Sequence, residues 1–332
     1  MQDTKIITYD VPNCIYCDTL GVRYQSNVLD PDGIIQTPWS YNQCNNNECK
    51  LVWLDPAPLE TELWKAYTNY HTHTKRKENL ASKAFLSVIN RIVRITMLPL
   101  WLINGIYKEA RQIRLMMLGQ QACGKLLDIG CGGGRFLNRM QRRGWVVEGI
   151  DFDAQATRRV GEKYGIKTYT GDLLSAKMPD ASFDAITMGH SIEHLVNPKA
   201  TLCECLRILK PGGTLVITTP NVESRAAKEF GPFWRGWEPP RHLHLFNTET
   251  IKLFLVSAGF KVGEIRTLAA TSGTYRASAI NQRKSEGQAV TLSFKIKLIF
   301  WSYYQELKDI YAQKEGFATG QNLLVVATKP LQ

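Results

Sequence analysis

Four cysteines near the N-terminus have the spacing of a metal site. Two residues separate Cys14 from Cys17, and four residues separate Cys44 from Cys49. Thiolates in two such close pairs can supply the four ligands of a tetrahedral structural zinc ion. The competing interpretation is a degenerate module whose thiols stay free. We favour zinc, because a segment this short cannot bury a core large enough to be stable alone.

A glycine-rich turn is the second group of residues whose pattern points to chemistry. An apolar run at 126–129 contains Asp128 and leads directly into Gly130, Cys131, Gly132 and Gly134. Glycines at a strand–helix junction let the backbone approach a ligand closely, and the helix that follows presents its N-terminal amides. A nicotinamide dinucleotide site would need a further glycine at position 135, where the chain has arginine, so that kind of site is disfavoured.

Two acidic residues stand at the ends of later predicted strands. Asp151 ends the strand expected at 146–151 and is followed by Phe152, and Asp172 stands beside Leu173 after the strand expected at 167–170. A carboxylate offers several acceptor positions and can bind two hydroxyl donors at once, as a ribose requires. Each acid also has a simpler interpretation as a surface or capping carboxylate, so the pattern gains force only from its order along the chain.

Histidines are the candidate bases. Four of the six histidines form two clusters, His190 with His194 and His242 with His244. An unperturbed imidazole titrates at about pH 6.5 and can take a proton from a hydroxyl acceptor. We take His190, His242 and His244 as catalytic candidates, with His242 first because Trp237 and Arg241 nearby suggest an acceptor pocket. The competing interpretation of the second cluster is a pair of structural histidines.

These patterns resemble the motifs of class I S-adenosylmethionine-dependent methyltransferases over residues 125–328. The resemblance implies S-adenosylmethionine as cofactor, with Asp128 and the backbone of 130–134 at its methionine end, Asp151 on the ribose and Asp172 on the adenine. The implied cofactor contacts are Asp128, Gly130, Cys131, Gly132, Gly134, Asp151, Phe152, Asp172, Leu173, Gly189 and His190. Glu193 and His194 resemble that family's glutamate–histidine motif, which either orients a helix start or takes part in catalysis.

The segment 14–58 resembles the zinc-ribbon N-terminus of certain bacterial methyltransferases that are often linked to polysaccharide synthesis. Asp18 and Lys50 follow the second cysteine of each pair, where that family usually has glycine. The asparagines at 45–47 are expected to supply the left-handed turn instead, because asparagine tolerates that conformation.

Alternating strands and helices must position these residues. From residue 125 onward, short apolar runs bounded by glycine alternate with helical segments. This order predicts an α/β fold: a doubly wound, mostly parallel, seven-stranded Rossmann-like sheet that binds ligands at the carboxyl ends of its strands. We expect a zinc-ribbon-like module at 1–58, a helical cap or linker at 59–120 and the methyltransferase domain at 121–332.

Two further segments of that domain are expected to stand apart from the sheet. A lid at about 222–247 carries Trp234, Arg235 and Trp237, and aromatic rings around an arginine suit a sugar or an anionic group. The alternative for these aromatics is core packing. An apolar, aromatic insertion at about 268–320 is the expected partner of the helical cap.

Charge is concentrated in one segment. The chain has a net charge of +11, and residues 75–114 contain nine basic and two acidic residues. The basic amphipathic stretch 80–114 is either a cap packed on protein or an interfacial helix with Trp101 at the lipid head groups. The uncharged stretch 95–107, interrupted by Pro99, is too short to span a bilayer. With no apolar run at the N-terminus, the expected location is cytoplasmic or peripheral to a membrane.

The function expected from these patterns is methyl transfer from S-adenosylmethionine to an oxygen of a small molecule, a glycan or a lipid-linked saccharide. The basic charge leaves methylation of an RNA base as a rival, although no RNA-binding module is recognised and nucleic acid is not the expected partner. A second rival is a non-catalytic S-adenosylmethionine-binding protein, because cofactor contacts alone do not establish turnover.

Overall fold

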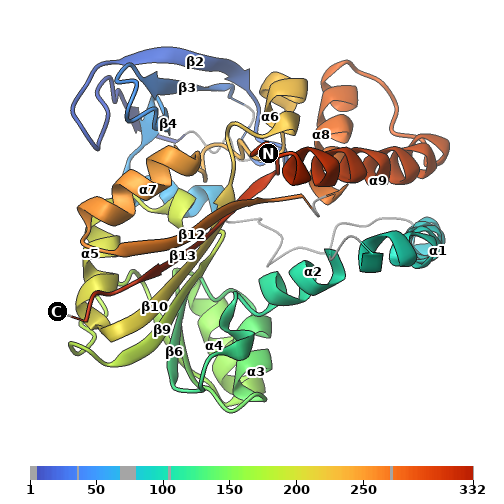
Figure 1. The fold of residues 1–332 in the computed structure, drawn as a ribbon. Coiled ribbons are helices and arrows are strands. Elements are labelled where there is room, and N and C mark those ends of the chain that lie inside the picture. Colours follow the sequence, from blue (N-terminus) through green and yellow to red (C-terminus); the bar gives the residue numbers. More distant parts are fainter. Residues whose placement is uncertain (1–5, 36, 68–79, 104–105, 270–271, 332) are drawn as a thin grey trace.

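The computed structural model describes the chain except residues 1–5, 36, 68–79, 104–105, 270–271 and 332, and its centre is a twisted seven-stranded sheet (Figure 1). In spatial order the strands are β12 (Lys261–Leu268), β13 (Asn322–Thr328), β10 (Leu209–Pro220), β9 (Phe183–Gly189), β6 (Lys125–Ile129), β7 (Val146–Asp151) and β8 (Lys167–Thr170). All neighbouring pairs are parallel except the two that β13 makes with β10 and β12. The predicted doubly wound, mostly parallel sheet is confirmed.

Helices cover both faces of this sheet. α3 (Arg135–Gln141) and α4 (Ala154–Tyr164) lie on one face, and α5 (Pro198–Ile208) and α7 (Thr248–Ser257) lie on the other (Figure 1). The central strands are therefore buried on both sides, which explains why they form continuous apolar runs in the sequence.

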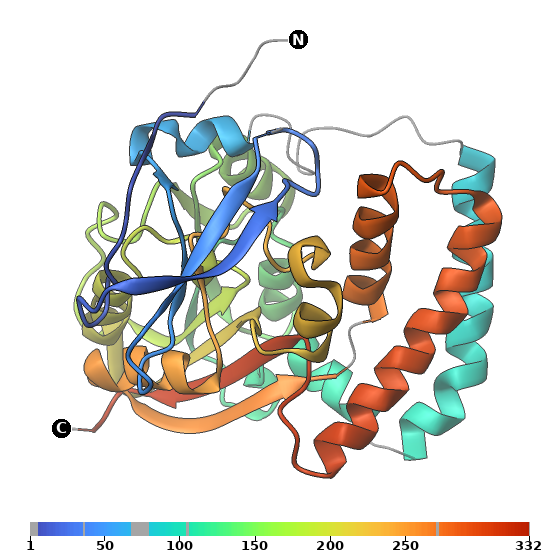
Figure 2. The same cartoon turned by 90° about the horizontal axis from the view of Figure 1, so that it is seen from above.

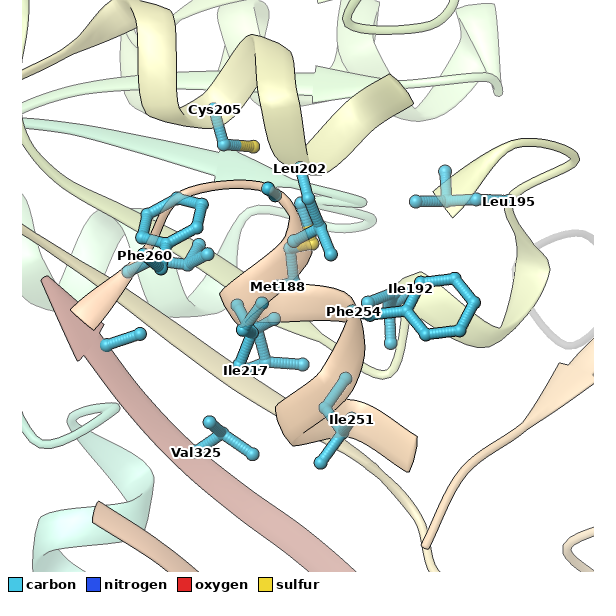
Figure 3. Close-up of a cluster of buried hydrophobic side chains, with 14 of the residues drawn as sticks. Met188, Ile192, Leu195, Leu202, Cys205, Ile217, Ile251, Phe254, Phe260 and Val325 are labelled. Atoms are coloured by element: carbon cyan, nitrogen blue, oxygen red, sulfur yellow. The ribbon is translucent and has the colours of Figure 1, made fainter. Parts of the chain in front are cut away.

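The face under α5 and α7 holds the largest hydrophobic core. Leu202 of α5 and Ile251 and Phe254 of α7 are fully buried, and they belong to the same cluster as Met188 of β9 and Ile217 of β10 (Figure 3). Burying a Leu, Ile or Phe side chain stabilises the fold by about 1.5–3 kcal/mol. This core fixes the carboxyl end of β9, which His190 follows directly.

The N-terminal module is joined to the rest of the chain by a shared sheet. Its strands β2 (Gly21–Val28), β3 (Trp39–Cys44) and β4 (Val52–Leu54) continue into β11 (His244–Leu245), which belongs to the predicted lid. A separate pair is formed by β1 (Thr8–Tyr9) and β5 (Ala57–Pro58). The short helix η1 (Glu60–Tyr67) then leads toward the cofactor side of the sheet.

The predicted lid is mostly buried in the structure. It contains α6 (Arg225–Phe230) and the short helix η4 (Gly231–Phe233), and it packs against the N-terminal module. Trp234 and Trp237 are each only 2% exposed and lie in this second core. The interpretation of these indoles as a sugar-binding surface is therefore wrong, because both are used in packing.

Four helices form a layer at the side of the molecule (Figure 2). α1 (Leu80–Ile103) packs on α9 (Leu292–Lys314), and α2 (Ile106–Arg114) and α8 (Ser272–Ser285) complete the layer. Val93 of α1 is buried against Ile299 and Tyr303 of α9. The insertion is thus the partner of the helical cap, as predicted.

The outer side of α1 is exposed and apolar. The helix continues through Pro99, because Met97 and Trp101 on either side of the proline still pack toward α9. By length and composition alone, residues 81–103 are sufficient to cross a membrane, and only 6% of the most apolar window is buried in the structure. The sequence analysis treated Pro99 as an interruption of the uncharged stretch 95–107. That prediction is wrong, because α1 continues through the proline.

Candidate functional site

A cavity of about 470 Å³ opens where β6, β7, β8 and β9 end, a volume within the usual range of small-molecule sites. The predicted cofactor residues that line it are Gly130, Gly132, Asp151, Phe152, Asp172, Leu173 and His190. Trp64 and Tyr67 of η1 line it as well, and the sequence analysis did not name them. The signal that could have identified them is the pair of aromatic residues in a short helical segment beside the predicted domain.

The glycine turn owes its shape to three left-handed residues. Gly130, Gly132 and Gly134 have φ values of 77°, 50° and 67°. A Cβ atom on Gly130 would lie 2.7 Å from Ser191 Cβ, whereas one on Gly132 would meet nothing within 4 Å. Gly130 therefore allows close packing, while Gly132 presents open backbone to the cavity.

Three predicted residues of the turn lie behind the cavity rather than in its lining. Cys131 is buried against Gly149, where a Cβ on the glycine would lie 2.8 Å from the sulfur, and Gly134 begins α3 against Val160. Asp128 is 6% exposed and accepts a 2.6 Å hydrogen bond from the Thr187 hydroxyl. Burial raises the pKa of Asp128 to about 7, and the charge of Asp151 adds to this shift.

Asp151 links the second strand to the glycine turn. Its Oδ2 accepts a 2.8 Å bond from the Gly132 amide, and its Oδ1 accepts a 2.9 Å bond from the Asp153 amide. Each carboxylate oxygen keeps a second acceptor position for a hydroxyl group in the cavity. Phe152 lines the cavity with 65% of its surface exposed, so its ring is available for contact with a ligand.

The third wall of the cavity follows β8. Gly171 has a φ of 120°, which turns the chain so that Asp172 and Leu173 face the cavity. Asp172 Oδ1 accepts a 2.6 Å bond from the Ser175 amide, and Leu173 is 2% exposed. The pair therefore combines an oriented carboxylate with an apolar surface, which suits a flat heterocycle that carries an amino group.

His190 is the catalytic candidate that reaches the cavity. Its φ is 55°, a left-handed conformation that costs free energy for a residue with a Cβ and that occurs preferentially at functional sites. Its amide donates a 2.8 Å bond to the Thr218 carbonyl, and half of its side chain is exposed. Gly189, the last residue of β9, is not part of the lining.

A buried carboxylate lies beside His190. Glu193 Oε1 is 3.4 Å from His190 Nδ1, and Oε2 accepts a 2.9 Å bond from the Thr219 hydroxyl. Partial burial of His190 favours its neutral form, but the charge of Glu193 outweighs this and raises the pKa of His190. Burial likewise opposes the charge of Glu193, yet His190 and the other nearby histidines hold the pKa of Glu193 at about 2. Such a pair has the composition of a base and the group that orients it.

The other histidines form a more deeply placed group. His194 lines the cavity, and its Nδ1 lies 3.1 Å from the Tyr67 hydroxyl and 2.9 Å from the Arg241 carbonyl. His242 is buried with its ring 4.7 Å from that of His194. Burial lowers the pKa of His242 to about 4, and the neighbouring His194 contributes to this shift.

His244 lies outside the cavity. Its Nδ1 is 3.1 Å from the Leu195 carbonyl, and burial lowers its pKa to about 4. Neither His242 nor His244 is among the residues that line the cavity. The structure thus brings His190 and His194, rather than the His242–His244 pair, to the proposed reaction site.

The surroundings that made His242 attractive are structural. Arg241 is completely buried and pairs with Asp30 at 2.7 Å, Asp32 at 3.0 Å and Glu238 at 3.1 Å. A fully buried arginine held by three carboxylates fixes the N-terminal module to the segment around residue 240, and it is not available to bind an acceptor.

The four N-terminal cysteines converge as predicted. The Sγ atoms of Cys14 and Cys49 are 3.6 Å apart and those of Cys17 and Cys44 are 3.4 Å apart, with all four within 4.8 Å of one another. These separations exclude disulfides, whose S–S length is about 2.05 Å. They are close to the roughly 3.8 Å edges of a tetrahedron with Zn–S bonds of about 2.3 Å. The Cys49 thiol lowers the pKa of Cys14 to about 5, whereas the Cys14 thiol raises the pKa of Cys49 and burial raises the pKa of Cys44 to about 11, so that one of the clustered thiols ionises first.

The loops that hold the cysteines differ in one respect from expectation. Asp18 and Lys50 have φ values of 58° and 50°, so these two residues themselves adopt the left-handed conformation that glycine would favour. The asparagine run at 45–47 was expected to do so, and that expectation is wrong. Asn46 instead accepts a hydrogen bond from the Glu48 amide, which closes a local turn.

The cysteine group also contacts the core of the large domain. Thr250 at the start of α7 donates a 2.6 Å bond to the Cys49 carbonyl. The ring of Tyr16 lies 4.9 Å from that of Phe254. The module is therefore packed directly against the helix that covers the sheet.

Protein purified without added metal is expected to contain about one zinc ion per chain. Cys49→Ser should lower this content and loosen the N-terminal module, because the free energy of metal binding contributes to folding. Elemental analysis measures the content, and Cys203→Ser on the exposed side of α5 is the matched control. Metal-free protein with an ordered module and four titratable thiols would contradict the prediction.

Comparisons with known proteins agree with this architecture. Residues 104–265 match a family model described as a methyltransferase domain. A ubiquinone biosynthesis O-methyltransferase from Paracidovorax citrulli is 33% identical over 111 residues, 31% of this chain and 46% of that protein. An uncharacterized methyltransferase from Mycobacterium bovis is 31% identical over 118 residues, 35% of this chain and 58% of that protein. The chain thus spans about half the length of the curated relatives it matches.

Similar folds are also present among solved structures. A SAM-dependent methyltransferase from Archaeoglobus fulgidus has a TM-score of 0.45 and 22% identity, covering 68% of this chain and 94% of that one. The sheet has the predicted strand arrangement, and residues 104–265 are similar to a methyltransferase domain.

Proposed function

We propose that this protein transfers a methyl group from S-adenosylmethionine to an oxygen of a small-molecule or saccharide acceptor. The observation that carries the proposal is the pairing of His190 with the buried Glu193 at the wall of the cofactor cavity. A hydroxyl acceptor must lose its proton as the methyl group arrives, so a positioned base accelerates that reaction. Similarity to ubiquinone biosynthesis O-methyltransferases supports an oxygen acceptor.

Each residue of the cavity has a separate proposed role. Asp151 binds the ribose hydroxyls, Asp172 and Leu173 hold the adenine, and the open backbone at Gly132 receives the methionine end. Bound S-adenosylmethionine supplies an activated methyl group on its sulfonium. Glu193 keeps a proton on His190 Nδ1 and so leaves Nε2 free to accept the proton of the acceptor.

His190 replaces His242 as our first choice of base. His190 lines the cavity and has an exposed side chain, whereas His242 and His244 are buried behind it. Trp64 and Tyr67 are proposed to cover the acceptor, because much of catalysis by methyl transfer is exclusion of water and positioning of the reacting atoms.

The remaining parts have supporting roles. Zinc held by the four cysteines would be structural, since four thiolates leave no open coordination position. The exposed apolar side of α1 supports peripheral contact of residues 80–114 with a membrane, where a lipid-linked saccharide would be reached.

A transfer assay separates this function from its rivals. Purified protein is incubated with S-adenosylmethionine labelled on the methyl group and with a lipid extract, a set of nucleotide sugars or total RNA. We expect label in the lipid or sugar fractions, in a form stable to base-specific nuclease treatment. Label in RNA alone would establish an RNA methyltransferase, and cofactor binding without any transfer would indicate a non-catalytic role.

A further inference from the structure

A second cavity, of about 790 Å³, lies between α1, α2, α8 and α9. It shares no described lining residue with the cofactor cavity. Its positive charge comes from Arg91, Arg94, Arg111, Arg114 and Arg276. The methyl-transfer reaction proposed above uses none of these residues.

Among the described residues the five arginines have one anionic neighbour in the cavity, Glu306, whose charge interacts with Arg94 and Arg276. None of them forms an ion pair with a described carboxylate within 4.0 Å. Arg276 is held by neutral groups, with Nη1 donating to Asn90 Oδ1 at 3.1 Å and to Ser302 Oγ at 3.3 Å. Arg94 lies 5.9 Å from the centre of the Trp101 ring. Guanidinium groups are therefore oriented around the cavity, and only Glu306 among the described lining residues offsets part of their charge.

One carboxylate lines the same cavity and compensates little of this charge. Glu306 is 3% exposed, and its Oε2 accepts a 2.9 Å bond from the Ser272 amide. Burial raises the pKa of Glu306. Even with Glu306 fully ionised, the lining has a net formal charge of +4, which favours an anion with several acceptor oxygens.

A cavity with a largely apolar wall, which Lys83 and Lys295 also line, adjoins the arginines and is called the apolar cavity below. It has a volume of about 750 Å³ and shares Ser87, Asn90 and Arg276 with the charged cavity. Its apolar lining consists of Leu86, Ile280, Val290, Leu292, Leu298 and Ile299, on α1, α8, α9 and the loop between α8 and α9. A ligand that fills both cavities must be amphiphilic, with an anionic end and a hydrocarbon end.

The outer side of α1 indicates where such a ligand comes from. Val88, Ile92 and Ile95 on this helix are 55%, 55% and 60% exposed. The polar edge of the same helix carries Arg91 and Arg94. An apolar face bordered by arginines is the pattern of a helix that lies at the surface of an anionic membrane.

We propose that the two cavities together bind a phosphate-bearing membrane lipid, with its head group among the five arginines and its chain along the apolar cavity. This inference extends the proposed membrane contact, and it does not depend on the methyl-transfer reaction. Its test contains neither S-adenosylmethionine nor turnover, so the two proposals fail separately.

Vesicle sedimentation tests the proposal with the full-length chain. We expect binding to phosphatidylcholine vesicles that contain phosphatidylglycerol, and little binding to phosphatidylcholine alone. Arg94→Gln combined with Arg111→Gln should weaken this binding by about 30-fold. The matched control is Arg142→Gln with Arg143→Gln, which removes two charges from the arginine cluster at α3, where the described lining has no apolar side chain. The control should bind nearly as the parent does.

A second variant tests the apolar cavity. Ala277→Trp should fill that cavity and weaken the binding of long-chain phosphatidylglycerol. A short-chain, water-soluble phosphatidylglycerol should still bind to this variant. An unchanged thermal unfolding transition verifies that each variant is folded.

Four results would overturn the proposal. They are equal binding to neutral and anionic vesicles, equal weakening by the two double substitutions, displacement of the protein from vesicles by millimolar inorganic phosphate alone, and preferential binding of duplex RNA over anionic vesicles.

Discussion

Replacing Asp151 with alanine is expected to weaken the binding of S-adenosylmethionine by about ten- to a hundredfold or more. Each charge-assisted hydrogen bond contributes about 1.5–3 kcal/mol, and the carboxylate has acceptor positions for two ribose hydroxyls. Asp151 also accepts hydrogen bonds from the Gly132 and Asp153 amides. The substitution therefore removes the side-chain hydrogen bond that links β7 to the glycine turn. Isothermal titration calorimetry on the purified chain measures the effect.

Asp151→Asn separates charge from geometry. Asparagine keeps one oxygen that can accept the Gly132 amide, so the turn should stay closer to its present shape while the charge is lost. We expect an affinity between those of the parent and the alanine variant, with an unchanged thermal transition. Full affinity in both variants would show that the ribose is held elsewhere and would remove Asp151 from the site.

The cofactor side of the molecule was predictable because its information is local. Asp128 and Asp151 lie in the last two positions of their strands, and Gly130 and Asp172 follow theirs within two residues. Parallel strands bring their carboxyl ends to one edge of the sheet. The positions of the strands along the chain were therefore sufficient to predict that these residues lie near one another. The sequence could not predict how deeply each residue is buried. Asp128 lies under the glycine turn, whereas Asp151 lines the cavity.

The acceptor side was harder to predict because its contacts are long-range. Alternation of His242 and His244 with leucine fits a strand beside a polar cavity and a strand beside a buried polar network equally well. The second arrangement is present because Asp30 and Asp32 pair with Arg241. These two residues lie about two hundred residues earlier in the chain. Pairing of β11 with β4 likewise joins segments that no sequence pattern connects.

Replacing His190 with asparagine is expected to lower turnover by about a hundredfold or more while leaving cofactor affinity nearly unchanged. Asparagine tolerates the left-handed conformation at this position, so the loop after β9 should keep its shape. It cannot accept a proton as imidazole does, and the loss therefore reports on the base. The measurement is the initial rate of methyl transfer at saturating S-adenosylmethionine, with the acceptor fraction identified by the transfer assay.

His244→Asn is the matched control for this substitution. His244 is buried outside the cavity with Nδ1 near the Leu195 carbonyl, so its replacement should affect stability more than rate. Near-parental turnover of the His190 variant, together with a large loss of turnover in a His242 or His194 variant, would contradict the prediction. It would indicate that His194 or His242 is the base.

The pH dependence distinguishes a base from a residue that only shapes the loop. His190 acts as a base only when neutral, and Glu193 raises its pKa, so the rate of the parent should climb with pH through a range above the ordinary value of about 6.5. Glu193→Gln keeps an acceptor for the Thr219 hydroxyl but removes the charge that stabilises protonated His190. The midpoint of its rate profile should consequently move to lower pH, and the plateau rate should fall because Nδ1 is less firmly oriented. A flat profile from pH 5.5 to 8 in the parent, or an unmoved midpoint in the variant, would leave positioning of the acceptor, without a histidine base, as the source of the rate.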